Sequence, residues 1–146
     1  MEHTLIILKP DGVCKKHTGD VIKRFEQEGF KLVGLKMLHL DRQKAEGFYA
    51  VHQGKHFFEP FMHFIVSAPS IIMVWEGKDV VLRAREIMGS TNSPEAKEGT
   101  LRCLWGTDNR RNLIHGSESK SAAATEISYF FNPDELYSYE SGDWDR

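Results

Sequence analysis

The chain has 146 residues, of which 40% are hydrophobic and 27% are charged, and its formal net charge is -2. This length and composition predict one soluble domain that buries about two-thirds of its unfolded surface. The small net charge excludes the global basic field that general nucleic-acid binding requires, so any anion site must be local. The sequence shows no basic leader and no apolar run of membrane-spanning length, and we therefore expect a cytoplasmic protein without a membrane anchor.

The first elements follow from apolar runs and the turn residues between them. A continuously apolar run over 4–8 predicts a buried strand that ends at the turn Pro10-Asp11-Gly12. Thr18 is expected to cap a helix that closes at Gly29, and a second strand is expected over 31–40. The later pattern predicts, in chain order, two helical pieces within 42–66 separated by a loop at 54–56, a strand over 70–75, a helix over 78–88, a loop over 90–99, a short helix over 100–105, a short strand over 112–115 and a helix over 119–131.

This order of elements predicts an α+β sandwich in which helices cover a small sheet. We expect residues 1–138 to form a single domain and the acidic residues 139–146 to form a tail. Cys14 and Cys103 stand far apart and neither has a CxxC partner, which argues against a disulfide framework or a structural zinc site. We expect two packed or incidental thiols.

The strongest chemical signal is His115, which ends a short apolar run and is followed at once by Gly116 and Ser117. An imidazole at a strand end with a glycine beside it is well placed to attack a group in a cleft, so His115 is a candidate nucleophile. The alternative is a hydrogen-bonded structural histidine, which is the more frequent use of a lone histidine beside aliphatic residues.

Two arginines on the predicted helix over 78–88 differ in the residues that stand three and four positions away from them. Arg83 has Asp79 four residues before it and Glu86 three residues after it, so an ion pair along its own helix explains it. Arg85 has only apolar residues and glycine at those spacings, and it must find an anion elsewhere. A long-range salt bridge or a snorkelling side chain is the alternative reading of Arg85.

The same spacing rule identifies Glu126 on the last predicted helix. The residues three and four positions away from it are alanines and aromatic residues, so no cation on its own helix can pair with it. An imidazole N–H is a suitable donor, because a catalytic histidine usually has a partner that orients it. We therefore expect Glu126 to bond His115, with a solvent-exposed glutamate as the alternative.

Several polar side chains would together suit a polyphosphate, whose transferred group spreads negative charge over several oxygens. They are Lys9, Tyr49, Arg85, Thr91, Arg102 and Asn112. The sequence contains neither GxxxxGK[ST] nor GxGxxG, so side chains rather than a glycine-rich loop must bind any phosphate. Phe57 and Phe58 are adjacent and cannot both face the core, which predicts one exposed ring for stacking on a base.

The chain as a whole resembles the nucleoside diphosphate kinases. The resemblance covers nearly the whole length to about Phe131, with its blocks in the family's order and spacing. These blocks are Lys9-Pro10-Asp11-Gly12-Val13, Lys23-Arg24-Phe25-Glu26, Val74-Trp75-Glu76-Gly77, Gly89-Ser90-Thr91-Asn92, Gly99-Thr100-Leu101-Arg102 and the stretch from Asn112 to Ser119. The last block, which contains His115, is highly specific.

The resemblance implies a two-step exchange in which ATP phosphorylates His115 and a second nucleoside diphosphate then takes the phosphate. It makes Glu126 and Ser117 the groups that orient His115. It implies a ferredoxin-like sandwich with a four-stranded antiparallel sheet, and a homo-oligomer that is a tetramer or a hexamer. It places phosphate or sugar contacts on Lys9, Tyr49, Arg85, Thr91, Arg102 and Asn112, and base stacking on Phe57.

The resemblance also implies Mg²⁺ bound with the nucleotide phosphates, without a direct protein ligand and with Glu118 near the metal through water. Members commonly have an aspartate where Glu118 stands. The stretch from Cys103 to Arg111 departs further from the family pattern, and Asn109-Arg110-Arg111 is unusually polar, so the wall that faces the base is expected to differ. Two alternatives remain. One is a non-catalytic nucleotide-binding protein of the same fold, and the other is a nucleic-acid-binding module, which Arg110-Arg111 suggests.

Overall fold

A four-stranded antiparallel sheet forms the centre of the computed structural model, which describes residues 1–146. The strands, in chain order, are β1 (Glu2–Leu8), β2 (Lys31–Leu38), β3 (Ser70–Gly77) and β4 (Ile114–Gly116). Their order across the sheet is β2-β3-β1-β4, and every neighbouring pair is antiparallel. The predicted α+β fold with a four-stranded antiparallel sheet is confirmed.

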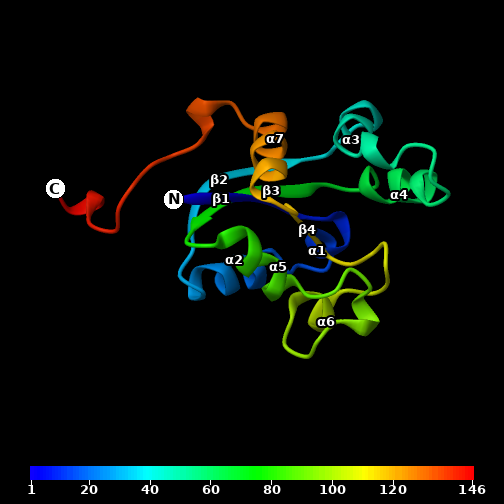
Figure 1. Cartoon of the computed structure of the whole chain (residues 1–146), viewed down its shortest axis with the longest axis horizontal. Helices are drawn as coiled ribbons and strands as arrows, with labels where there is room; N and C mark the ends of the chain where they lie inside the picture. The colour runs from blue at the N-terminus through cyan, green and yellow to red at the C-terminus, as the bar shows by residue number, and fades with distance from the viewer.

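Helices cover both faces of this sheet (Figure 1). On one face lie α2 (Thr18–Gln27), α5 (Val80–Met88) and the short α6 (Leu101–Trp105). On the other face lie α3 (Arg42–Phe48), α4 (Phe58–Ile65) and α7 (Lys120–Phe130). The shorter elements are α1 (Pro10–Cys14) and four 3₁₀ turns at Ala50–His52, Ser93–Glu95, Pro133–Glu135 and Asp143–Asp145.

Alternation along the central strands explains why both faces need covering. In β1, Ile6 and Leu8 join the core beneath α2 and α5, whereas Leu5 and Ile7 join the core beneath α3, α4 and α7. All of these side chains are fully buried, because a strand between two helical layers has no solvent-facing side. This burial is why the sequence of β1 is continuously apolar.

Several element ends differ from the sequence expectations, among them four that lie near the start of the chain or before His115. Pro10-Asp11-Gly12 begins the helix α1 with Pro10 at its first position, where the missing N–H costs no hydrogen bond. The cap of α2 is His17, one residue before the predicted Thr18, and β2 ends at Leu38 rather than residue 40. The fourth strand is Ile114–Gly116 rather than 112–115.

The chain ends in a segment that first follows β2 and then extends away from the sheet (Figure 1). The backbone N–H of Tyr137 donates to Val33 O (2.9 Å), and the Lys31 ammonium pairs with Glu140 (3.4 Å). Beyond this contact Trp144 is 84% exposed. No helix in the structure combines the length and the apolar character that crossing a bilayer requires.

Candidate active site

His115 is the middle residue of β4, where it pairs with Ile7 of β1. Its ring packs edge-on against Phe48, with 5.4 Å between the ring centroids, and its Nε2 lies 3.1 Å from Glu126 Oε1. A carboxylate only accepts hydrogen bonds, so Nε2 carries the proton and the Nδ1 lone pair is free. The imidazole side chain is 20% exposed, which leaves it accessible to a ligand.

Ser117 connects Glu126 to the sheet. Its hydroxyl accepts from the backbone N–H of Leu5 (3.2 Å) and donates to the same Glu126 oxygen (2.7 Å). Burial raises the pKa of Glu126, but the contacts with His115 and Ser117 and the positive charge of Arg85 together outweigh burial, so the pKa lies below its ordinary value. Glu126 is therefore an ionised carboxylate at neutral pH, positioned by both β4 and α7.

Lys9 follows β1 and directs its ammonium to Asn112, with Nζ 2.6 Å from Oδ1. The amide of Asn112 in turn donates to Thr91 O (2.8 Å), while the Thr91 side chain is exposed. Burial, reinforced by the positive charge of Arg102, lowers the pKa of Lys9 to about 7. Lys9 is therefore a buried cation whose charge a bound anion would stabilise.

Two arginines lie on the opposite side of β4 from α7. Arg102 donates to three backbone carbonyls, those of Gly89 (2.8 Å), Ile114 (2.6 Å) and Asn112 (3.3 Å). Burial and the neighbouring Arg85 lower the pKa of Arg102 to about 10, and it remains charged at neutral pH. Arg85 donates only to Gly116 O (3.3 Å) and has no carboxylate partner within salt-bridge distance.

The prediction that Arg83 forms an ion pair along its own helix is wrong. Arg83 does not pair along its own helix but reaches α2, where it donates to Glu28 O (2.9 Å) and lies 4.0 Å from the Glu28 carboxylate. Its guanidinium also stacks 4.4 Å from the centroid of the Phe30 ring. The contrast with Arg85 nevertheless holds. The Arg83 guanidinium contacts a carbonyl, a carboxylate and an aromatic ring, whereas the Arg85 guanidinium makes a single hydrogen bond to Gly116 O.

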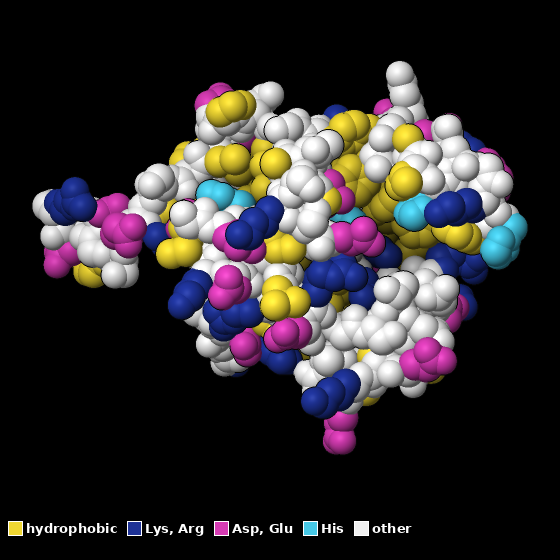
Figure 2. Space-filling model, viewed as in Figure 1, with side chains coloured by type: hydrophobic (Ala, Val, Ile, Leu, Met, Phe, Trp, Pro, Cys, Tyr) yellow, Lys and Arg dark blue, Asp and Glu magenta, His cyan; other side chains and the backbone are white.

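Aromatic residues form the other wall of the site. Tyr49 is buried between His115 and Phe61, and its hydroxyl has no hydrogen-bond partner; burial raises its pKa. Phe57 is 40% exposed whereas Phe58 is 6% exposed, so one ring of the pair is available, as predicted. Figure 2 shows a hollow between the α3–α4 side and the α6 side, with basic side chains on one edge and apolar side chains on the other.

Two features of the site were not found from the sequence. Leu113 has a φ of 81°, which is unusual for a non-glycine residue. Its backbone N–H donates to Asp11 Oδ2 (3.0 Å), and its carbonyl accepts from the N–H of Lys9 (2.8 Å). Asp11 and β1 thus hold the backbone bend that precedes His115, and no local sequence pattern signals this contact.

The structure contains no group of three or more His, Cys, Asp and Glu side chains that could hold a metal ion. Glu118 is exposed and follows His115 by three residues, and Arg85 and Arg102 bond the carbonyls of Gly116 and Ile114 on either side of His115. One exposed oxygen-donor side chain near a cluster of cations suits a hard cation that keeps most of its water, as Mg²⁺ does.

The family model described as nucleoside diphosphate kinase matches residues 2–136. The chain belongs to the nucleoside diphosphate kinase family. It is 53% identical to the nucleoside diphosphate kinase of Carboxydothermus hydrogenoformans over 140 residues, which cover 96% of this chain and 94% of the relative. The corresponding enzyme of Heliobacterium modesticaldum is 47% identical, with 100% of this chain and 95% of the relative covered.

Solved nucleoside diphosphate kinases share the fold. The Halobacterium salinarum enzyme, determined in complex with CDP, superimposes with a TM-score of 0.93 at 40% identity, covering 98% of this chain and 96% of the other. The Aquifex aeolicus enzyme superimposes with a TM-score of 0.90 at 41% identity, covering 93% and 99%. This chain is therefore a nucleoside diphosphate kinase that transfers phosphate from a nucleoside triphosphate to a nucleoside diphosphate, and the predicted family, fold and activity are confirmed.

Proposed function

We propose that the kinase reaction proceeds through two phosphoryl transfers at His115 Nδ1. The Nδ1 lone pair attacks the γ-phosphorus of a nucleoside triphosphate such as ATP, and the bond from that phosphorus to the bridging oxygen breaks with release of the diphosphate. A terminal oxygen of a second nucleoside diphosphate then attacks the same phosphorus and breaks the P–N bond. The supporting observation is that Glu126 occupies Nε2 and leaves Nδ1 free.

The surrounding side chains suit the positioning that phosphoryl transfer requires. Glu126 holds the ring and stabilises the positive charge that the imidazole gains on phosphorylation, and Ser117 positions Glu126. The cations, the hydroxyls and the Asn112 amide are assigned to the phosphates and the sugar, and the exposed ring of Phe57 to stacking on the base. This assignment covers Lys9, Tyr49, Arg85, Thr91, Arg102 and Asn112.

Mg²⁺ is assigned as the cation that enters with the nucleotide, with Glu118 near it through water. The fit rests on the donor set described above, in which one exposed carboxylate follows His115 by three residues and two arginines bond the carbonyls on either side of His115. When bound, the metal neutralises charge on the phosphate oxygens. The residues of the chain then orient the phosphates and exclude water.

We also propose that the kinase is a homo-oligomer, a tetramer or a hexamer. The strand β2 is an edge of the sheet, and its side chains Leu35 and Met37 are 51% and 61% exposed. The C-terminal segment bonds this edge at Val33, and the exposed apolar side chains of Leu35 and Met37 beyond it favour covering by another copy of the chain. Sedimentation should give a mass several times that of the chain and a lower mass for Met37→Glu, and a monomeric wild type would contradict this.

The exposed free thiols Cys14 and Cys103 support a reducing compartment, so we place the enzyme in the cytoplasm. Of the two alternatives expected for these thiols, packed or incidental, their exposure favours the incidental one.

The phosphohistidine mechanism is tested with γ-labelled ATP. We expect an acid-labile, alkali-stable label on the wild-type enzyme that added GDP removes, and no label on His115→Ala. The control is His39→Ala, because His39 bonds Val66 O (2.8 Å) outside the site and its loss should leave labelling intact. A label that persists in His115→Ala, or that GDP fails to remove, contradicts the mechanism.

A further inference from the structure

The backbone that leads into His115 is strained at Leu113. Leu113 has a φ of 81°, and the N–H of Ile114 donates to the carbonyl of Asn112 (3.0 Å), so these three residues form a γ-turn. The form of this turn with a positive φ is rare, and a non-glycine residue adopts it only where its surroundings enforce it. Whatever enforces the turn therefore also sets the direction in which β4 presents His115.

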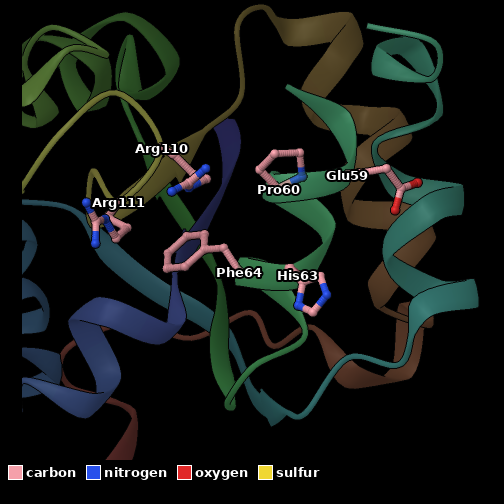
Figure 3. Close-up of a pocket in the computed structure, with 6 residues that line it drawn as sticks. All are labelled: Glu59, Pro60, His63, Phe64, Arg110 and Arg111. Carbon is pink, nitrogen blue, oxygen red and sulfur yellow. The ribbon is translucent and has the colours of Figure 1, made fainter. Parts of the chain in front are cut away.

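The polar segment that precedes the turn is not held from the side of α4. Arg110 and Arg111 face a hollow of about 540 Å³ whose opposite wall is α4 (Figure 3). The residues that line it are Glu59, Pro60, His63, Phe64, Arg110 and Arg111. Arg111 pairs with Asp108 in its own segment, and the one hydrogen bond of Arg110 runs from its backbone N–H to Asp108, which leaves its guanidinium free. The support for the γ-turn must come from another element.

The helix α1 supplies this support. Asp11 Oδ2 accepts from the N–H of Leu113 (3.0 Å), and the carbonyl of Leu113 accepts from the N–H of Lys9 (2.8 Å). The other oxygen of the Asp11 carboxylate is buried and has no hydrogen-bond partner, so the bond to Leu113 is the one that orients it. A methyl group on Gly12 would lie 3.0 Å from Leu113 Cδ1, so α1 also packs directly against the Leu113 side chain. Leu113 is thus held at its N–H, its carbonyl and its side chain.

We infer that Asp11 is a positioning residue for phosphoryl transfer, because it fixes Leu113 and thereby places the imidazole of His115 relative to the Lys9 ammonium. The inference rests on the phosphohistidine mechanism proposed above. Arg102 bonds the carbonyls on either side of Leu113, whereas Asp11 bonds Leu113 itself. A displacement of reacting groups by about 1 Å can slow such a reaction about a hundredfold, so the γ-turn matters for the rate.

Two substitutions of Asp11 separate the hydrogen bond from the charge. Asp11→Asn keeps an oxygen that can accept from the Leu113 N–H, whereas Asp11→Ala removes it. Burial and Arg102 lower the pKa of Lys9, and the charge of Asp11, which both variants remove, acts in the opposite direction. Both variants should therefore bind ADP more weakly than the wild type and by the same factor, because Lys9 carries less charge in each.

Single-turnover phosphorylation by saturating γ-labelled ATP should distinguish the two variants. We expect Asp11→Ala to slow the reaction roughly tenfold to a hundredfold, and Asp11→Asn to slow it less than about threefold. The matched control is Glu2→Ala, because Glu2 also accepts from a distant backbone N–H, that of Val81 (3.1 Å), but stands at the other end of β1 from Lys9. Its rate should stay within about twofold of the wild type.

Thermal unfolding shows whether each variant is folded. If Asp11→Ala does not fold, Asp11→Glu replaces it, because the longer side chain keeps the charge but displaces the acceptor. Asp11→Glu should bind ADP like the wild type and slow phosphorylation at least about fivefold.

Three results would each overturn the inference: a folded Asp11→Ala or Asp11→Glu within about twofold of the wild type, an Asp11→Asn as slow as Asp11→Ala, or a Glu2→Ala as slow as Asp11→Ala. A wild-type enzyme that takes no label contradicts the phosphohistidine mechanism itself. A wild type that is labelled at the same rate as Asp11→Ala contradicts the positioning role of Asp11 and leaves that mechanism standing.

Discussion

Replacing Glu126 probes the contact on which the mechanism depends. Glu126→Gln keeps an oxygen that can accept from His115 Nε2 but removes the negative charge. Glu126→Ala removes both the acceptor and the charge, and it also leaves the Ser117 hydroxyl without its partner at 2.7 Å. The two variants therefore separate orientation of the ring from stabilisation of the charge that develops on it.

The expected magnitude follows from the strength of these hydrogen bonds. A hydrogen bond to a charged group contributes about 1.5–3 kcal/mol, against about 0.5–1.5 kcal/mol for a neutral one. The carboxylate binds the phosphorylated, positively charged ring more strongly than the neutral ring, so most of the difference appears in the rate. We expect Glu126→Gln to slow phosphorylation by roughly fivefold to fifteenfold and Glu126→Ala by roughly thirteenfold to 150-fold.

Single-turnover labelling by γ-labelled ATP, measured across pH, tests these values. The lowered pKa of Glu126 means that its charge is lost as pH falls through the folded-state value, so the rate advantage over Glu126→Gln should shrink at acid pH. The control is Glu135→Gln, which breaks a paired carboxylate outside the site, with Lys36 at 2.7 Å, and should leave the rate unchanged. Glu126→Ala within about twofold of wild type would refute the reasoning.

Two further results are expected. When a nucleotide binds at about pH 8, the enzyme should take up a proton, because the pKa of Lys9 is about 7 in the free site and bound phosphate restores its charge. Calorimetric heats of binding that are equal in buffers of different ionisation enthalpy would contradict this. Arg85→Ala should slow phosphoryl transfer about a hundredfold, and Arg83→Ala should slow it less than about twofold. The reason is that Arg85 bonds only Gly116 O, whereas Arg83 is held by Glu28. Equal rates in the two variants would show that the free Arg85 guanidinium has no special role.

The sequence predicted those parts of the site that depend on spacing within one element. Glu126 has no cation within reach on its own helix, and the structure places its carboxylate on His115, eleven residues away. The same rule identified Arg85 as unpaired, because a missing partner at three or four residues can be seen without any tertiary information. The continuous apolar run over 4–8 likewise predicted a buried strand, and the structure buries it on both faces.

The same rule failed for Arg83, whose true partner lies 55 residues away on α2. The spacing allowed an ion pair with Asp79 or Glu86. In the folded protein α5 packs against α2, where Arg83 contacts the Glu28 carbonyl and carboxylate and the Phe30 ring together. The helix α1 was missed because five residues are too few to show a helical period. The start of β4 was misplaced because Leu113 adopts a φ of 81°.

The sequence by itself determined the order of strands and helices, the candidate nucleophile and the residues that lack a partner on their own helix. These follow from local spacing, since a helix or a strand repeats its geometry every few residues. Only the tertiary structure decided which distant groups meet: Asp11 with Leu113, Lys9 with Asn112 across 103 residues, and the free Arg110 beside Pro60 and Phe64. Such contacts depend on how helices and strands pack, and packing is settled by the burial of the whole core rather than by any single stretch of chain.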